Sequence, residues 1–236
     1  MYQGIKPHAR NAAMNAPSLR QSNESGTASS RVPAVLGLFL LIALQLPIPS
    51  LLVSGSSLRA LLEQEGIYWL MTVVVIGFVL LFERRPLRSI GLQVPTWRSL
   101  LWGLAAAAAA VIGIALIYSV LIPALGLPDD TAQTQAIVVL PLWFRCLLIT
   151  RAAVFEELVY RGFAIERLTE LIHVRWVAAG ISLAAFTYAH LNYWGWTHLL
   201  VAGLGGLVLT ALYLWRRDLA ANMIAHFATD AVGFLL

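Results

Sequence analysis

Long apolar stretches alternate with short polar connections along most of this chain. Seven such stretches, rich in Leu, Val, Ala and Ile, follow a polar first segment. They cover residues 34–54, 67–82, 99–122, 137–165, 174–191, 197–215 and 219–236. A helix needs about 20 apolar residues to cross the hydrocarbon core of a bilayer. The pattern therefore predicts an all-α fold, a polytopic membrane bundle of about seven transmembrane helices (range six to eight), the second and last of which are short.

Prolines and alanines refine this picture. Pro47 and Pro49 interrupt the first stretch, which predicts a kink or a partly re-entrant start. Pro141 marks the expected beginning of the helix in the fourth stretch. The third stretch holds six consecutive alanines, residues 105–110, whose small side chains suit either close packing of a neighbouring helix or contact with lipid.

The composition agrees with a membrane protein. Hydrophobic residues make up 59% of the chain and charged residues 12%, whereas soluble domains average about 45–50% and about 25%. Residues 1–32 are polar and lack apolar periodicity, so we expect a disordered tail there, not a signal peptide, and a bundle over 33–236. A single cysteine, Cys146, excludes an internal disulfide and a multi-cysteine metal site. The sequence contains no basic run with interleaved aromatic residues, so we expect no nucleic-acid partner.

Basic residues gather in alternate connections, which predicts the orientation. One set of connections carries Lys6, Arg10, Arg20, Arg31, Arg84, Arg85, Arg88, Arg98, Arg167, Arg175, Arg216 and Arg217. The other set carries Arg59 with Glu63 and Glu65, then Asp129 and Asp130, and no Lys or Arg between 176 and 215. The positive-inside rule then places the N-terminus in the cytoplasm, in a cytoplasmic (inner) membrane, and seven spans place the C-terminus outside.

Three charged residues, Glu156, Glu157 and Arg161, lie deep in the fourth stretch. Such charges cost about 2.5–3.5 kcal/mol each at the centre of a membrane helix, so they usually face a protein interior or a water-filled cavity. Glu157 and Arg161 are four residues apart and share a helix face, while Glu156 points about 100° away. Arg161 can thus neutralise one carboxylate and leave the other available as a general base. The simpler alternative is a buried ion pair beside a surface glutamate.

Two later stretches each contribute a histidine. His190 closes the fifth stretch, a position that is by itself more typical of an interfacial residue. His226 and Asp230 are four residues apart in the last stretch and share a face. They can serve one site or bond each other, and the simpler alternative is a polar pair that joins two helices.

The expected depths of these residues agree with a shared pocket. At about 1.5 Å per residue, Glu156 lies about 16 Å, His226 about 14 Å and His190 about 22 Å from the nearest cytoplasmic marker. The markers are Arg167, Arg217 and Arg175, respectively. The sequence therefore predicts one polar pocket in the cytoplasmic half of the membrane or near its midplane.

The three segments follow the pattern Glu-Glu-x-x-x-Arg, Phe-x-x-x-His and His-x-x-x-Asp, in that order, with the second at Phe186 and His190. This pattern resembles the membrane endopeptidases that include the type II CAAX prenyl proteases and the bacterial CPBP (Abi) proteins. The resemblance covers about residues 85–236, with the protease-like motif region at 137–236. It implies a helical bundle that hydrolyses peptide bonds of membrane-associated proteins or peptides, prenylated CAAX-type substrates among them. Its implied partners are the lipid bilayer and a protein or peptide substrate.

The resemblance also implies a role for each residue. Glu156 would activate a water molecule, and His190 would help to hold that water. Glu157 and Arg161 would form the pair that orients Glu156. His226, together with the acid four residues later, would stabilise the oxyanion on the scissile carbonyl.

Asp230 and metal ions raise two further questions. Many members of the family carry Asn where this chain has Asp230, and a charged Asp would repel an oxyanion. We therefore expect Asp230 to be protonated, bonded to His226 or bound to a metal.

Glu156, His190, His226 and Asp230 are all suitable zinc ligands, but no His-Glu-x-x-His motif occurs in the sequence. We expect metal-independent chemistry, with zinc or another divalent metal as the alternative.

Two arginines and two rival functions stay open. Arg145 and Arg151 on the fourth helix can bind a substrate carboxylate, or Arg145 can extend to the interface. Arg151 has no evident partner in the sequence.

A non-catalytic scaffold or bacteriocin-immunity-type factor would keep the pocket and act by binding a partner. A proton-coupled transporter would use the carboxylates as a proton relay and would need broken helices around them. Pro47 and Pro49 lie far from the motifs in the sequence, which weakens this alternative.

Overall fold

The computed structural model describes residues 36–37, 39–128 and 131–236, and in these ranges it contains helices and no strand. The first part comprises α2 (Ile48–Leu52), α3 (Leu58–Gly77), η1 (Phe78–Phe82), η2 (Leu87–Ile90), α4 (Trp97–Leu116), η3 (Ile117–Leu121), α5 (Ile122–Leu125) and α6 (Thr131–Val138). The second comprises α7 (Leu142–Glu156), η4 (Glu157–Ala164), α8 (Ile165–Ile172), α9 (Arg175–Ala189), α10 (Leu191–Trp194), α11 (His198–Arg216) and α12 (Leu219–Phe234). The predicted all-α bundle is confirmed. The predicted tail, residues 1–32, and Asp129 and Asp130 lie outside the described residues.

Within the described ranges, three helical segments are long and apolar enough to cross a membrane: Leu58–Phe82, Trp97–Leu125 and His198–Arg216. A fourth candidate is the pair Ala132–Val138 and Leu142–Ile172, which is bent by 118° at a short break. α9 and α12 have 15 and 16 residues, fewer than a full crossing needs. The protein is thus a membrane helical bundle, and the number seven stays a prediction.

Several predicted boundaries change in the structure. The second span begins at Leu58, not at residue 67, because the side chain of Ser57 caps the helix by accepting a hydrogen bond from the Ala60 amide. α7 begins at Leu142, directly after Pro141, as predicted. The fourth span continues through η4 and α8 to Ile172, beyond the predicted end at residue 165.

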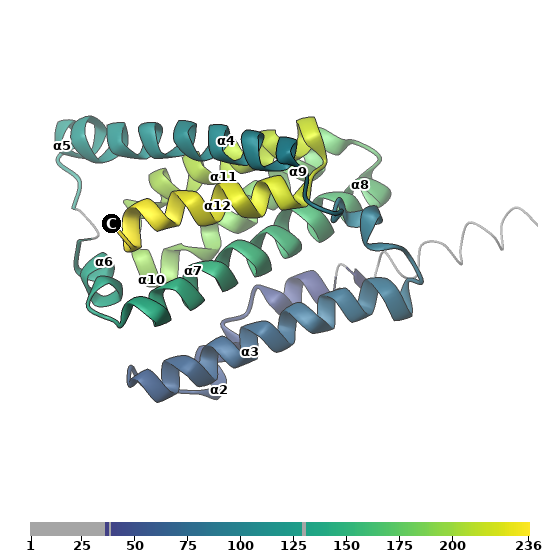
Figure 1. Ribbon diagram of the computed structural model, residues 1–236, viewed down its shortest axis with the longest axis horizontal. Helices are drawn as coiled ribbons and strands as arrows, with labels where there is room; N and C mark the ends of the chain where they lie inside the picture. Colours follow the sequence, from purple (N-terminus) through teal and green to yellow (C-terminus); the bar gives the residue numbers. More distant parts are fainter. Residues whose placement is uncertain (1–35, 38, 129–130) are drawn as a thin grey trace, which may run out of the picture.

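The prolines near the start break the first apolar stretch, as predicted. Residues 39–44 are helical, and α2 begins at Ile48, between the two prolines. The helix stops ahead of Pro47 because a residue that precedes proline disfavours helical backbone angles. Figure 1 shows α2 and α3 along one side of the bundle, opposite α4.

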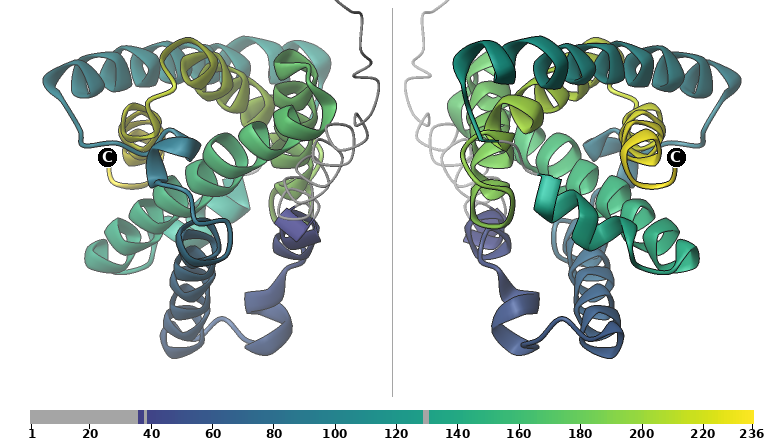
Figure 2. Two further views of the ribbon diagram at one scale, coloured as in Figure 1. Left: turned by 90° about the vertical axis from the view of Figure 1, so that its right-hand side faces the viewer. Right: turned by 90° about the vertical axis from the view of Figure 1, so that its left-hand side faces the viewer.

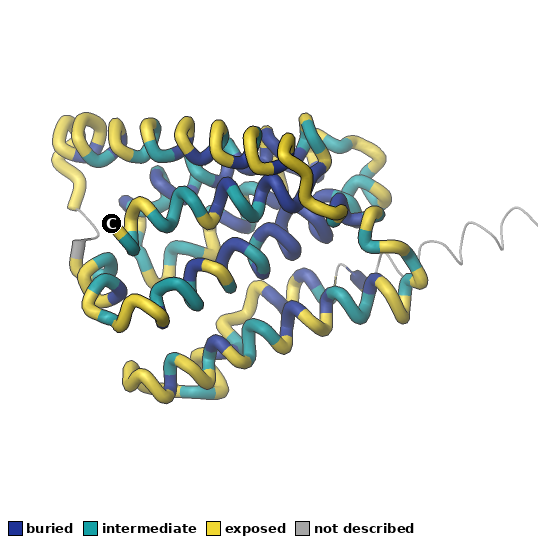
Figure 3. The backbone as a smooth tube through the Cα atoms, viewed as in Figure 1, coloured by how far each residue is buried: buried dark blue, intermediate teal, exposed yellow. Residues whose placement is uncertain are grey.

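α12 lies in the middle of the bundle, between α4 and α7, and Figure 2 shows the same layering from both ends. α4 approaches α12 closely because Gly103 has no side chain: a Cβ there would lie 2.8 Å from the Ala221 carbonyl oxygen. Ala107 and Ala110 are buried, whereas Ala105, Ala108 and Ala109 are exposed. The alanine run therefore combines both predicted uses, a close helix contact on one face and an open outer face. Burial is concentrated where η4 and α12 meet (Figure 3).

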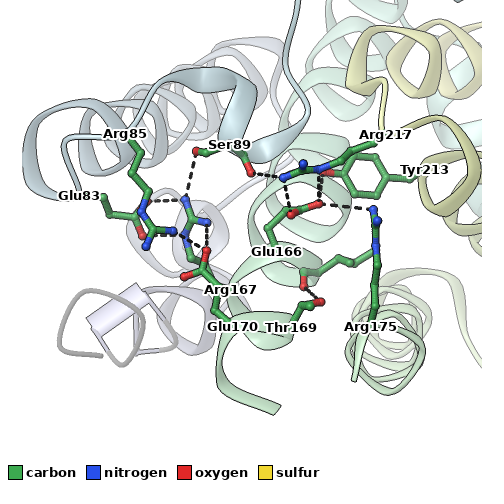
Figure 4. Close-up of polar contacts among 11 residues, drawn as sticks. Glu83, Arg85, Ser89, Glu166, Arg167, Thr169, Glu170, Arg175, Tyr213 and Arg217 are labelled. Carbon is green, nitrogen blue, oxygen red and sulfur yellow. Dashed lines mark hydrogen bonds and ion pairs between the residues drawn. The ribbon is translucent and has the colours of Figure 1, made fainter. Parts of the chain in front are cut away.

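A polar cluster at one end of the bundle corrects one prediction (Figure 4). Arg167, predicted to be a loop charge, lies inside α8, is 1% exposed and binds Glu83 and Glu170. Buried ion pairs of this kind hold segments far apart in the sequence against each other. Arg167 contacts the Ser89 hydroxyl at 3.5 Å and Arg217 donates to the Ser89 carbonyl at 3.0 Å. Two of the three residues used as depth markers, Arg167 and Arg217, therefore lie close to one residue.

Candidate functional site

The helix that carries the paired glutamates changes its winding at that point. α7 ends at Glu156, and the π-helical segment η4 begins at Glu157 and runs to Ala164, with every residue buried. π-Helical turns are rare and are found frequently at functional sites, because their i→i+5 hydrogen bonds displace side chains from regular α positions. The unusual backbone thus coincides with the residues singled out by their charge.

Glu157 and Arg161 form the predicted ion pair. The Arg161 guanidinium donates to Glu157 Oε1 at 2.8 Å, and the two side chains are 0% and 1% exposed. Arg161 also donates to the Gly206 carbonyl at 3.1 Å and lies 4.1 Å from the centroid of the Phe186 ring. The guanidinium is therefore fully engaged inside the protein.

Glu157 has two further partners on α12 that the sequence did not indicate. His226 Nδ1 lies 2.8 Å from Glu157 Oε1, and the Asn222 amide donates to Glu157 Oε2 at 3.1 Å. A carboxylate paired with Arg161 acts as an acceptor, so Nδ1 carries the proton of this bond. Glu157 thus orients the imidazole of His226, whereas the resemblance had implied that it orients Glu156. The other ring nitrogen, Nε2, is not used in the contact with Glu157 and faces Glu156 and Asp230.

Glu156 lies on the opposite side of the same imidazole. Its Oε2 is 3.9 Å from His226 Nε2, and its Oε1 is 3.7 Å from Arg151 Nη1. The side chain is 19% exposed, yet Oε2 is buried and has no hydrogen-bond partner among the described residues. Although the two glutamates point in different directions, both reach His226, because the imidazole has a nitrogen on each side. An unsatisfied buried carboxylate oxygen is expensive and calls for a functional explanation.

Asp230 stands beside the same nitrogen as Glu156. Its Oδ2 lies 3.5 Å from His226 Nε2, one helical turn further along α12. Nε2 is therefore placed between two carboxylates, with Asp230 nearer than Glu156. Of the three expectations for this residue, its position favours an interaction with His226.

His190 is near these residues but does not bond them. Its Nδ1 lies 2.8 Å from the Phe186 carbonyl oxygen, and in the described part of the chain it makes no hydrogen bond or ion pair with either glutamate. The Phe186 ring is near both imidazoles, with its centroid 4.7 Å from that of His190 and 6.3 Å from that of His226. The two histidines are thus linked through contacts with the same aromatic ring.

Arg151 pairs with Glu65, which the sequence pattern had assigned to a connection between helices. Glu65, predicted to be a connection charge, lies inside α3 and is 5% exposed. Arg151 donates to both of its carboxylate oxygens, Nε at 2.9 Å and Nη2 at 2.8 Å. The guanidinium also lies 4.2 Å from the centroid of the Tyr68 ring. This bidentate pair links α3 to the neighbourhood of Glu156, and only the depth of Glu65 within an apolar helix could have indicated it.

The pair between Glu65 and Arg151 yields a testable coupling. Glu65→Gln and Arg151→Gln each leave one buried charge without its partner, and each is expected to destabilise the protein by about 3–5 kcal/mol. The double variant removes both charges, so it is expected to be more stable than the sum of the two losses, by about 1–3 kcal/mol. Thermal unfolding of the four proteins in the same detergent measures this cycle. Additive losses would contradict a direct pair.

Arg145 serves the end of α12. Its Nη1 donates to the Phe234 carbonyl oxygen at 2.6 Å, at the last residue of that helix. Basic side chains stabilise the unpaired carbonyl groups and the negative dipole end of a helix C-terminus. Arg145 therefore has a capping contact that the sequence did not predict, and its two predicted roles stay predictions.

An apolar groove opens beside the polar residues. It has a volume of about 520 Å³ and lies between α4, α7 and α12. Its wall includes Ala153 and Val154, just before the paired glutamates, and Phe227 and Ala231, which adjoin His226 and Asp230 in sequence. The groove is thus lined by residues that neighbour the charged residues in sequence, and none of the charged residues lines it.

The predicted zinc ligands do not form a ligand set in this geometry. Among the described residues, no three His, Cys, Asp or Glu side chains are grouped so that they could hold a metal ion. His226 uses Nδ1 for Glu157, and His190 uses Nδ1 for a backbone carbonyl. Glu156 and Asp230 lie near His226 Nε2, whereas His190 contacts the Phe186 ring.

Comparison with known proteins found a family similarity in the later part of the chain. Residues 135–232 match the family model described as type II CAAX prenyl endopeptidase, Rce1-like. The match contains η4, α9 and most of α12, together with all six predicted site residues, but Glu65 lies outside it. Neither the curated proteins nor the solved structures gave a match.

Proposed function

We propose that this membrane protein is an endopeptidase that hydrolyses peptide bonds of membrane-associated proteins or peptides, since residues 135–232 match the Rce1-like family model. The observation that carries the proposal is the placement of His226. Its imidazole is held by Glu157 on one side and faces Glu156 and Asp230 on the other, at 2.8, 3.9 and 3.5 Å. Peptide hydrolysis needs a base for water and a donor for the oxyanion, and this arrangement supplies both.

Glu156 is the general base in this proposal. Its unbonded Oε2 faces His226 Nε2 across 3.9 Å, a separation too long for a direct hydrogen bond and suited to a bridging water. Glu156 takes a proton from this water as the oxygen attacks the scissile carbonyl carbon. The proton then passes to the leaving amine, so that the carboxylate is restored.

His226 stabilises the oxyanion when its Nε2 carries a proton. The negative charge of Glu157 on Nδ1 and that of Asp230 near Nε2 both favour the imidazolium. Glu157 itself is balanced by Arg161, so the imidazole is held in a fixed orientation, as catalytic donors require. Asp230 therefore acts through His226 and needs no direct contact with the oxyanion. His190 contacts the Phe186 ring, which also lies near His226.

The groove supports a proposal for the substrate class. Its volume of about 520 Å³ and its mostly apolar wall suit the apolar part of a substrate, either a hydrophobic peptide segment or a prenyl chain on a CAAX-type cysteine. Pockets for small ligands have volumes of about 300–1,000 Å³. The family makes a lipidated peptide the first substrate to test.

The test compares one peptide in two forms, with and without a prenylated cysteine, incubated with the purified protein in liposomes. Cleavage products are identified by mass spectrometry. His226→Ala is expected to lower kcat by about 10²–10³-fold, the usual loss when an oxyanion donor is removed, while Phe227→Ala serves as a groove control that changes mainly KM. A parallel reaction with a metal chelator is expected to keep its rate.

The outcomes separate the rival functions. No cleavage of any membrane peptide, or full activity in both Glu156→Ala and His226→Ala, would refute the endopeptidase. A cellular phenotype that survives both substitutions would instead support a scaffold or immunity factor. Loss of activity in the chelator, restored by zinc, would refute only the metal-independent chemistry.

A further inference from the structure

A second groove lies on the outside of the bundle, between α4 and α11. It has a volume of about 350 Å³ and an entirely apolar wall, with Ala105, Ala106, Val208 and Ala211 along its length. Trp102 and Trp215 stand at one end, where α4 begins and α11 finishes; their ring centroids are 4.7 Å apart and their planes meet at 78°. This groove shares no lining residue with the one beside the glutamates.

Two arginines stand at the tryptophan end of the groove. The Arg216 guanidinium carbon lies 5.9 Å from the Trp102 ring centroid and 5.2 Å from that of Trp215. Arg98 is exposed, one turn ahead of Trp102 on α4, and its guanidinium lies over the neighbouring Trp97 ring at 5.5 Å. Aromatic rings thus hold both cations at the level where tryptophans usually meet the lipid headgroups.

Among the described residues, no acid forms an ion pair with either arginine. In the part of the chain that the structure describes, neither Arg98 nor Arg216 forms an ion pair, whereas the adjacent Arg217 binds Glu166 at 2.7 Å. An apolar channel that ends at two unpaired cations is complementary to a molecule with an apolar chain and an anionic head. The basic connections predict that this end faces the cytoplasm, where the membrane leaflet carries anionic lipids.

We propose that this groove binds one anionic phospholipid, with an acyl chain along the alanines and the phosphate group between Arg98 and Arg216. The site is separate from the proposed peptidase site, so binding is expected in a catalytically inactive variant as well. Phosphatidylglycerol is the probe, and phosphatidylcholine with the same chains is the uncharged comparison.

Native mass spectrometry of the full-length protein, titrated with each lipid, measures the binding. Juxtamembrane basic residues contribute about 1 kcal/mol each to binding of anionic lipid, which corresponds to about fivefold in affinity. Arg98→Gln and Arg216→Gln are each expected to weaken phosphatidylglycerol binding about fivefold, and the double variant about 25-fold. Binding of phosphatidylcholine should not change.

Two controls make the result decisive. Arg84→Gln/Arg88→Gln removes two exposed arginines that also lack an ion pair among the described residues but do not line the groove; its phosphatidylglycerol affinity should stay within twofold of the unsubstituted protein. Ala211→Phe fills the groove and should weaken both lipids, which free phosphate binding would not predict. Equal losses in the arginine control and in the Arg98/Arg216 variant, or unchanged binding in Ala211→Phe, would overturn the proposal.

Discussion

Replacing Glu156 with glutamine is expected to lower kcat for peptide cleavage by about 10²–10⁴-fold, the contribution usual for a positioned general base. Glutamine keeps the size of the side chain and its capacity to accept a hydrogen bond but cannot take up the proton of the attacking water. KM should change little, because Glu156 lies beside the groove and not in its wall. Initial rates over a range of peptide concentrations separate the two constants.

Two matched variants test whether the loss is specific to this carboxylate. Glu156→Asp keeps the charge but withdraws it by one methylene, so it should retain more activity than the glutamine variant. Glu63→Gln removes an exposed carboxylate of α3 that pairs with Arg59, and it should be as active as the unsubstituted protein. If Glu156→Gln cleaves the peptide at more than a tenth of the original rate, another group is the base.

The features that the sequence predicted best are those within a single helix. Residues four apart on a helix meet whatever the rest of the protein does, so the pair of Glu157 and Arg161 followed from spacing alone. The start of α7 after Pro141 followed equally from the restrictions that proline imposes on the backbone. Local geometry determined both, and the structure confirms both.

Contacts between helices were harder to predict, because a buried charge and a loop charge look alike in a sequence. Glu65 and Arg167 were both assigned to connections, yet each forms a buried ion pair with a residue more than 80 positions away. The π-helical winding of η4 was also missed. No residue pattern marks it, since it depends on the backbone hydrogen bonds that the packed segment adopts.

The link from Glu157 to His226 changes the predicted division of roles. Sequence spacing suggested that His226 and Asp230 act together, and the family resemblance implied that Glu157 orients Glu156. In the structure, Glu157 receives the bond from His226 Nδ1 while Asp230 stands at Nε2. The charge of Arg161 therefore acts on the histidine through Glu157, so the most deeply buried ion pair supports both the fold and the proposed oxyanion donor.

Arg161→Met is accordingly expected to destabilise the protein by about 3–5 kcal/mol, the usual loss when one partner of a buried pair is removed. Methionine fills a similar volume but leaves the Glu157 charge, with a side chain that is 0% exposed, to His226 and Asn222 alone. It also removes the contact with the Phe186 ring and the bond to the Gly206 carbonyl. Thermal unfolding in detergent measures the change.

The double variant Glu157→Gln/Arg161→Met distinguishes the buried charge from lost packing. If an unpaired carboxylate causes the loss, neutralising it should recover part of the stability, because removing both members of a buried pair is often far less damaging than removing one. If the guanidinium mattered only through its contacts with Phe186 and Gly206, the double variant would be at least as unstable as Arg161→Met. Since Glu157 also binds His226, the recovered protein should fold and yet cleave poorly, which separates the structural role of the pair from its support of catalysis.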